Sequence, residues 1–324
     1  IRKYIDILAY RLLTERNINI FIDIIQVTRT PLMQTKINTW LNIALNDLES
    51  AILLHRNGKY RNSYFLFQQA SEKANKAAAL FSGDFTEKEI EETSHDQFRI
   101  PRKIMVQKEE KMKAVIELLE SYPMPKDLEP LSHKSFAKHH KSISAAICSI
   151  DSLKNCDLVN FTLEDLDGFL EILTGLETIE YAFPENSNSI LRSQMQAMAR
   201  YFGELGTKEA LETKREILKM LADKKKSQMY FQNLMHHLIP IQFDSIFIDH
   251  TFYFCALLTI QHSSQTRYPK NGVNPEDIYT KELPIVQKQL DFIKFLKEAI
   301  LRLEKMNGNK QVLQNLFSNP TITQ

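Results

Sequence analysis

Apolar residues recur three and four positions apart along two successive segments, and this spacing constrains the fold more than any other feature of the chain. In the first segment they are Trp40, Ala44, Leu48, Ala51 and Leu54. Residues at this spacing share one face of a helix. Asn57-Gly58 then gives a turn signal, and a second helical pattern covers about 60–82. The spacing therefore predicts two amphipathic helices in sequence.

Helical periodicity continues through most of the remaining chain. Glycines number only 8, and few segments alternate apolar and polar residues, so we predict an all-α protein. The segment 17–25 is an exception, because its isoleucines repeat every second residue. A lone strand is marginal, so helix stays open there. Turns are expected at 121–130, at 183–189 and at Pro240, since proline does not continue a helix interior.

The charge balance and the cysteine content indicate which partners and which cellular compartment to expect for this chain. Lys and Arg total 41 and Asp and Glu 40, so net charge argues neither for nucleic acid nor for an acidic partner. The cysteines are odd in number (3) and lack CxxC spacing, which is typical of buried thiols in a reducing compartment. The longest apolar run, 252–260, is about half a membrane span. We expect a cytoplasmic protein with no membrane partner, and Ile1 leaves room for an upstream segment.

No motif for a cofactor or a metal is found. The chain contains no GxGxxG or GxxxxGK[ST] loop for a phosphate, no HExxH and no GxSxG. The neighbouring histidines His139-His140 and His236-His237 would point about 100° apart on a helix, so neither pair can face one ion. We therefore predict no cofactor and no metal.

The segment FLFQQASEKANKAAALF, residues 65–81, combines a polar and an apolar side on one predicted helix. The polar positions are Gln68, Gln69, Glu72, Lys73 and Lys76. Alanines and phenylalanines supply the opposite stripe, as in an ordinary amphipathic helix. Spacing alone favours a solvated face over a binding site, and it leaves both interpretations open.

The order of several motifs resembles the HEPN family, named for higher eukaryotes and prokaryotes and for nucleotide binding. The matching residues of the first two helices are Trp40, Ala44, Asp47-Leu48, Ala51, Leu54, Gly58-Lys59-Tyr60, Phe65, Gln68-Gln69-Ala70, Glu72-Lys73 and Lys76-Ala77. His95-Asp96 resembles the family's His-Asp before the next helix. Thr266-Arg267-Tyr268-Pro269, followed by a long amphipathic helix, resembles its terminal segment.

The resemblance implies an up-and-down helical bundle that often forms a homodimer. It covers 38–104 and 240–306, which we assign to the HEPN-like bundle. We interpret residues 105–239 as an inserted helical region. Residues 1–37 are expected to form an N-terminal helical extension, and 307–324 a flexible tail.

Many members resemble ribonucleases that carry Arg, four to six residues, and then His. The Arg would orient the phosphate and the His would transfer a proton. No Arg in this chain precedes a His at that spacing. His262 precedes Arg267 in reverse order, so a rearranged catalytic pair remains an alternative. The departure argues against ribonuclease activity of the usual family kind.

Other members resemble non-catalytic modules that bind nucleotides or RNA, or that partner a nucleotidyltransferase. The resemblance implies a bacterial defence or toxin–antitoxin setting and the ligand-binding candidates Gln68, Gln69, Lys73, Lys76, His95, Arg99 and Arg267. The alternative for each is hydrogen bonding between helices. A further alternative is an interaction scaffold that docks a partner on the apolar faces of 207–235 and 284–305.

Overall fold

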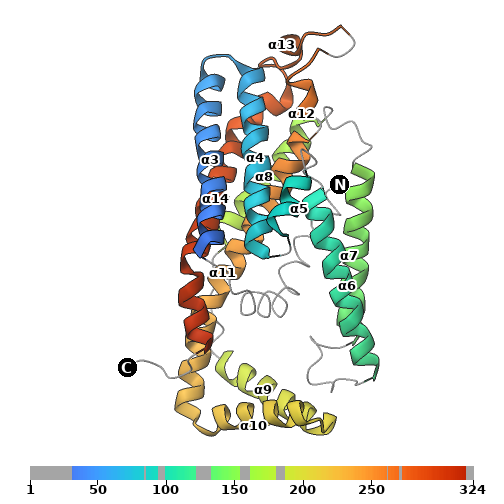
Figure 1. Cartoon of the computed structure of the whole chain (residues 1–324), viewed down its shortest axis with the longest axis vertical. Coiled ribbons are helices and arrows are strands. Elements are labelled where there is room, and N and C mark those ends of the chain that lie inside the picture. The colour runs from blue at the N-terminus through green and yellow to red at the C-terminus, as the bar shows by residue number, and fades with distance from the viewer. Residues whose placement is uncertain are drawn as a thin grey trace. The chain divides into compact units, whose positions relative to one another are not determined.

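The computed structural model describes residues 31–83, 85–93, 99–121, 133–153, 161–179, 187–260, 262–269 and 272–318 (Figure 1). Within these ranges the chain is helical and contains no β-strand, which confirms the all-α prediction. The segment 17–25, for which a strand was considered, lies outside them. The helices are α3 (Pro31–Arg56), α4 (Tyr60–Ser82), α5 (Glu87–Glu92), α6 (Arg99–Ser121), α7 (His133–Leu153), α8 (Leu163–Glu177), α9 (Ser187–Leu205), α10 (Lys208–Ala222), α11 (Lys224–Thr259), α12 (His262–Gln265), α13 (Pro275–Ile278) and α14 (Pro284–Ser318).

The chain divides into two compact units. Unit 1 comprises the described parts of 1–104, 149–179 and 243–324, and unit 2 those of 105–148 and 180–242. Residues 149–179, which lie within the predicted insertion 105–239, group with unit 1. The rings of Phe169 and Phe254 explain the grouping, because they stack with centroids 4.7 Å apart and so tie α8 to α11.

Helices α3 and α4 form an antiparallel pair in unit 1 (Figure 1). Gly58 makes the turn between them with a φ of 71°, a left-handed conformation that glycine adopts without a Cβ clash. The backbone N–H of Lys59 then donates to the carbonyl of Leu54 at 2.9 Å and closes the turn. The predicted helices and their turn are thus where the sequence places them.

Helix α4 lies at the centre of unit 1. It packs against α3, α5, α12, α13 and α14. Tyr64 and Phe67 on α4 have no exposed surface, and neither has Phe292 on α14. A helix covered by this many neighbours buries more than one face, and polar residues on such faces need partners inside the fold.

Unit 2 includes the packed pair α9 and α10. Ile217 and Leu221 of α10 pack with Ala199 of α9. Arg192 of α9 donates from Nη2 to the carbonyl of Leu221 at 2.6 Å and from Nη1 to Ser227 Oγ at 2.9 Å, so its guanidinium satisfies groups near the end of α10.

One local expectation differs from the structure. Helix α11 runs through Pro240, where a turn was expected. A proline inside a helix costs about 3 kcal/mol or more, so packing of the long flanking turns has to offset that cost. Helix α14 ends at Ser318. Among the cysteines, Cys255 is buried as expected and Cys148 is exposed. No helix in the described ranges is both long and apolar enough to cross a membrane.

Candidate functional site

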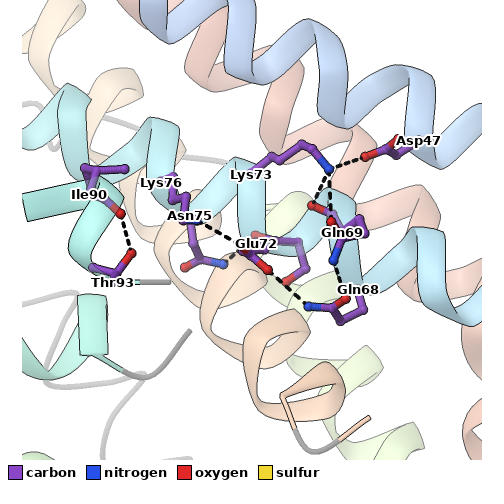
Figure 2. Close-up of polar contacts among 10 residues, drawn as sticks. Asp47, Gln68, Gln69, Glu72, Lys73, Asn75, Lys76, Ile90 and Thr93 are labelled. Atoms are coloured by element: carbon purple, nitrogen blue, oxygen red, sulfur yellow. Dashed lines mark hydrogen bonds and ion pairs between the residues drawn. The ribbon is translucent and has the colours of Figure 1, made fainter. Parts of the chain in front are cut away.

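The polar residues of α4 form a continuous hydrogen-bonded chain (Figure 2). Gln69 donates from Nε2 to Gln68 Oε1 at 2.7 Å, and Gln68 donates from Nε2 to Glu72 Oε2 at 3.3 Å. Gln68 has no exposed surface, and Glu72 is also buried. This face of α4 is therefore not a solvated face, because its side chains satisfy one another inside the bundle.

Lys73 links this polar chain to α3. Its Nζ lies 2.7 Å from Asp47 Oδ2, and both side chains are mostly buried. The same Nζ is 3.5 Å from the backbone carbonyl and from Oε1 of Gln69. Figure 2 shows the lysine extended between these groups on the two neighbouring helices. The ammonium charge is thus compensated within unit 1.

Lys76 closes the other end of the chain. Its Nζ lies 2.8 Å from Glu72 Oε1, and the two side chains are 11% and 9% exposed. The ammonium also lies 5.7 Å from the ring centroid of Trp40 on α3, within cation–π range. Both lysines predicted to meet a ligand are therefore engaged with carboxylates of the fold.

Two further residues, His95 and Arg99, are predicted to bind a ligand. His95 lies outside the described residues. Arg99, at the start of α6, is exposed and donates from Nη1 to the carbonyl of Glu92 at 2.7 Å. That bond joins the arginine to the end of α5.

Arg267 stands in a different environment from the α4 lysines. Its guanidinium carbon lies 5.0 Å from the ring centroid of Phe65 on α4. Its Nε is buried without a hydrogen-bond partner in the described part of the chain. Phe65 precedes Gln68 and Gln69 by three and four positions, so Arg267 covers the same face of α4 one turn away. Tyr268, the next residue, is 66% exposed.

A buried cluster holds the turn that carries Arg267. Thr266 has no exposed surface, and it donates to the carbonyl of His262 through its backbone N–H at 3.0 Å and through Oγ1 at 2.8 Å. Arg61 of α4 donates from Nη1 to the carbonyl of Thr266 at 2.8 Å. Sequence spacing cannot reveal this contact, because the two residues are 205 positions apart.

His262 faces the interior of the bundle. It is 1% exposed, and its Nδ1 lies 2.5 Å from the hydroxyl of Tyr279. Burial raises the pKa of the Tyr279 hydroxyl that lies beside this imidazole. The ring also packs edge-on against Tyr64, with centroids 4.7 Å apart. The imidazole is thus buried among Tyr64 and Tyr279, while the Arg267 guanidinium lies over Phe65, and the rearranged catalytic pair stays a prediction.

A metal site would need several His, Cys, Asp or Glu side chains close together. No group of three or more His, Cys, Asp or Glu side chains in the described ranges is arranged to hold an ion. The acidic residues of the α4 network instead accept from lysines and from an amide.

Comparison with known proteins supports the family resemblance. The family model for the HEPN domain matches residues 37–144, which confirms the resemblance inferred for 38–104; the part inferred for 240–306 stays a prediction. A HEPN domain implies a nucleotide- or RNA-binding or RNase-like module. The match spans α3 to α6 and part of α7, so Arg267 lies outside it. No curated protein and no solved structure matches the chain.

Proposed function

We propose that this chain is a non-catalytic nucleotide- or RNA-binding module in which Arg267 receives a phosphate. The observation that most supports this proposal is the environment of the Arg267 guanidinium. It lies over the ring of Phe65 and makes no hydrogen bond or ion pair within the described residues. Arginine offers a planar fork of N–H donors that matches phosphate oxygens. The ring beneath it limits solvation on one side and Nε is buried, so the two Nη groups are the donors that we assign to the ligand.

The other cations predicted to bind ligand support this choice by contrast. Lys73 and Lys76 lie 2.7 and 2.8 Å from Asp47 and Glu72. Recruiting either lysine to a phosphate would leave a largely buried carboxylate without its ion pair, which is costly. Gln68 has no exposed surface and is equally committed to its neighbours. We therefore assign these residues to the framework behind the site.

Tyr268 supplies a second element of recognition. Its ring is largely exposed and follows Arg267 directly in the chain. An aromatic ring beside a phosphate-binding arginine suits an unpaired nucleotide, whose base stacks while its phosphate is held. We propose a mononucleotide or single-stranded RNA as the ligand class. A single phosphate-binding arginine predicts a weak dependence on salt, because few phosphates are neutralised.

We further propose that the module acts as a homodimer and beside a nucleotidyltransferase, in a bacterial defence or toxin–antitoxin setting. This part rests on the HEPN match over residues 37–144. Light scattering of the purified chain tests the dimer, and co-expression with the product of a neighbouring nucleotidyltransferase gene tests the pairing. A monomer at micromolar concentration, or no co-purification, contradicts the respective part.

The binding proposal is tested with a fluorescently labelled single-stranded RNA of mixed sequence, competed by free nucleotides. Arg267→Ala should weaken binding at least about tenfold, since hydrogen bonds to charged groups are worth about 1.5–3 kcal/mol. Arg215→Ala removes an exposed arginine of α10 in unit 2 and serves as the matched control. Equal affinities of Arg267→Ala and Arg215→Ala, or no binding by the unmodified chain, would contradict the proposal.

A further inference from the structure

Arg61 connects three elements at one end of unit 1. It lies in the first turn of α4, where its Nε is 2.7 Å from Glu276 Oε1 on α13 and its Nη1 is 2.8 Å from the carbonyl of Thr266. Helices α12 and α13 both pack against α4 (Figure 1). One guanidinium thus joins α4 to α13 and to the turn directly before Arg267.

The bond to Thr266 acts on a turn that is already fixed on its inner side. Thr266 is buried and bonded twice to the carbonyl of His262, whose ring is held by Tyr279. Arg61 fixes the carbonyl of Thr266, and therefore the peptide plane that leads into Arg267. Because a peptide unit is planar, fixing this carbonyl also fixes the start of the Arg267 backbone.

We infer that Arg61 and Glu276 form a positioning pair that holds the Arg267 guanidinium over Phe65, ready for a phosphate. The inference rests on the proposed function. The pair contributes little to stability, because its side chains are 28% and 52% exposed and water screens ion pairs at the surface. Its distinctive effect is geometric, since Glu276 orients the fork of Arg61 toward Thr266.

A substitution of Glu276 tests the inference, because a charge effect and a positioning effect change the binding affinity in opposite directions. A carboxylate near a phosphate site repels the ligand, so charge alone predicts tighter binding when Glu276 is neutralised. A positioning role predicts weaker binding, because Arg61 is released and the turn before Arg267 relaxes. The two explanations therefore predict opposite changes in affinity for the same substitution.

The experiment measures the affinity of the full chain for labelled single-stranded RNA, with inorganic pyrophosphate as a second probe. Glu276→Gln should bind about threefold to tenfold more weakly, a change of about 0.7–1.4 kcal/mol. Its salt dependence should stay the same, because no phosphate contact is removed. Asp277→Asn is the matched control, since it removes the same charge from the neighbouring exposed position of α13 without touching Arg61.

A second comparison tests the positioning role of Arg61 and Glu276 separately from the phosphate-binding role of Arg267. In an Arg267→Ala background, Glu276→Gln should change affinity by less than about twofold, because the group being positioned is gone. If Glu276→Gln binds as tightly as Asp277→Asn, or more tightly, the positioning pair is rejected while Arg267 keeps its assigned role. If Arg267→Ala binds like the unmodified chain, the proposed function fails first and the inference fails with it.

Discussion

Lys73 and Asp47 lie 2.7 Å apart across the interface of α4 and α3, with side chains 19% and 21% exposed. This ion pair joins the polar face of α4 to its neighbour and places a lysine charge inside the fold. The residues on that face, from Gln68 to Lys76, therefore stabilise the bundle in a way that a solvated face does not.

The Lys73–Asp47 pair should contribute to stability and leave ligand binding nearly unchanged. Asp47→Asn removes the carboxylate from a mostly buried ammonium, so we expect a loss of about 1–3 kcal/mol in the free energy of unfolding. Urea denaturation measures the loss, and RNA affinity should change by less than about twofold. Glu91→Gln, on the exposed side of α5, is the control. A large loss of affinity at unchanged stability would place Lys73 in the binding site.

Lys76 and Glu72 form a more buried pair, and breaking it should cost more. Lys76→Met removes the ammonium that lies 2.8 Å from the buried Glu72 carboxylate, and we expect a loss of about 2–4 kcal/mol. In Lys76→Met/Glu72→Gln no net charge remains to be buried, so the double variant should be more stable than Lys76→Met alone. Chemical denaturation of both single variants and the double variant completes the cycle. A double variant that simply adds the two losses contradicts the coupling.

Local spacing predicted the helices of unit 1 because burial on one face leaves a direct trace in the sequence. Whether a polar face meets water depends on contacts that local spacing does not contain. Gln68 looks like a solvated residue in the sequence, yet α4 is covered on several sides and leaves it no exposed surface. Pro240 shows the same limit, since α11 continues through it.

The candidate site was predicted only in part for the same reason. The family resemblance supplied Arg267, and the structure adds its contact with Phe65. Arg61 carries no motif, and its contact with Glu276 spans 215 positions of the chain. Tyr268 was noted as part of a motif, but its exposure is visible only in the fold. Long-range partners of this kind need the three-dimensional arrangement of α4, α12 and α13.

Glu89 should make the stability of α5 depend on acid pH. Its carboxylate accepts from Lys103 and from Thr86 in a capping box, and these bonds lower its pKa from 4.5 to about 2. A lowered pKa in the folded state means that the contribution is complete above about 4.5 and is lost as the pH falls toward 2.

The test compares the unmodified chain with Glu89→Gln in thermal unfolding across this range. The difference in Tm should be largest near neutral pH and should shrink below about pH 4.5, because the two side chains become alike once Glu89 is protonated. A Tm difference that stays constant with pH would contradict the role of the Glu89 charge.

Tyr268 should distinguish single-stranded from duplex RNA. A stacked base contributes about 1–3 kcal/mol, so Tyr268→Ala should weaken binding of single-stranded RNA about fivefold to hundredfold. Tyr268→Phe keeps the ring and should bind almost normally. A duplex of the same sequence hides its bases, so its weaker binding should not respond to either change. The affinity for inorganic pyrophosphate should likewise be unchanged in the Tyr268 variants and should still fall in Arg267→Ala.

Val273→Ala controls for lost apolar surface, because Val273 is the exposed aliphatic side chain of the following loop. If it weakens binding as much as Tyr268→Ala does, general apolar contact explains the effect better than stacking. If Tyr268→Phe is as weak as Tyr268→Ala, the hydroxyl is the recognised group and the ring is not. Weak binding by Tyr268→Ala alone, with Tyr268→Phe and Val273→Ala near normal, identifies an unpaired base as the partner of this ring.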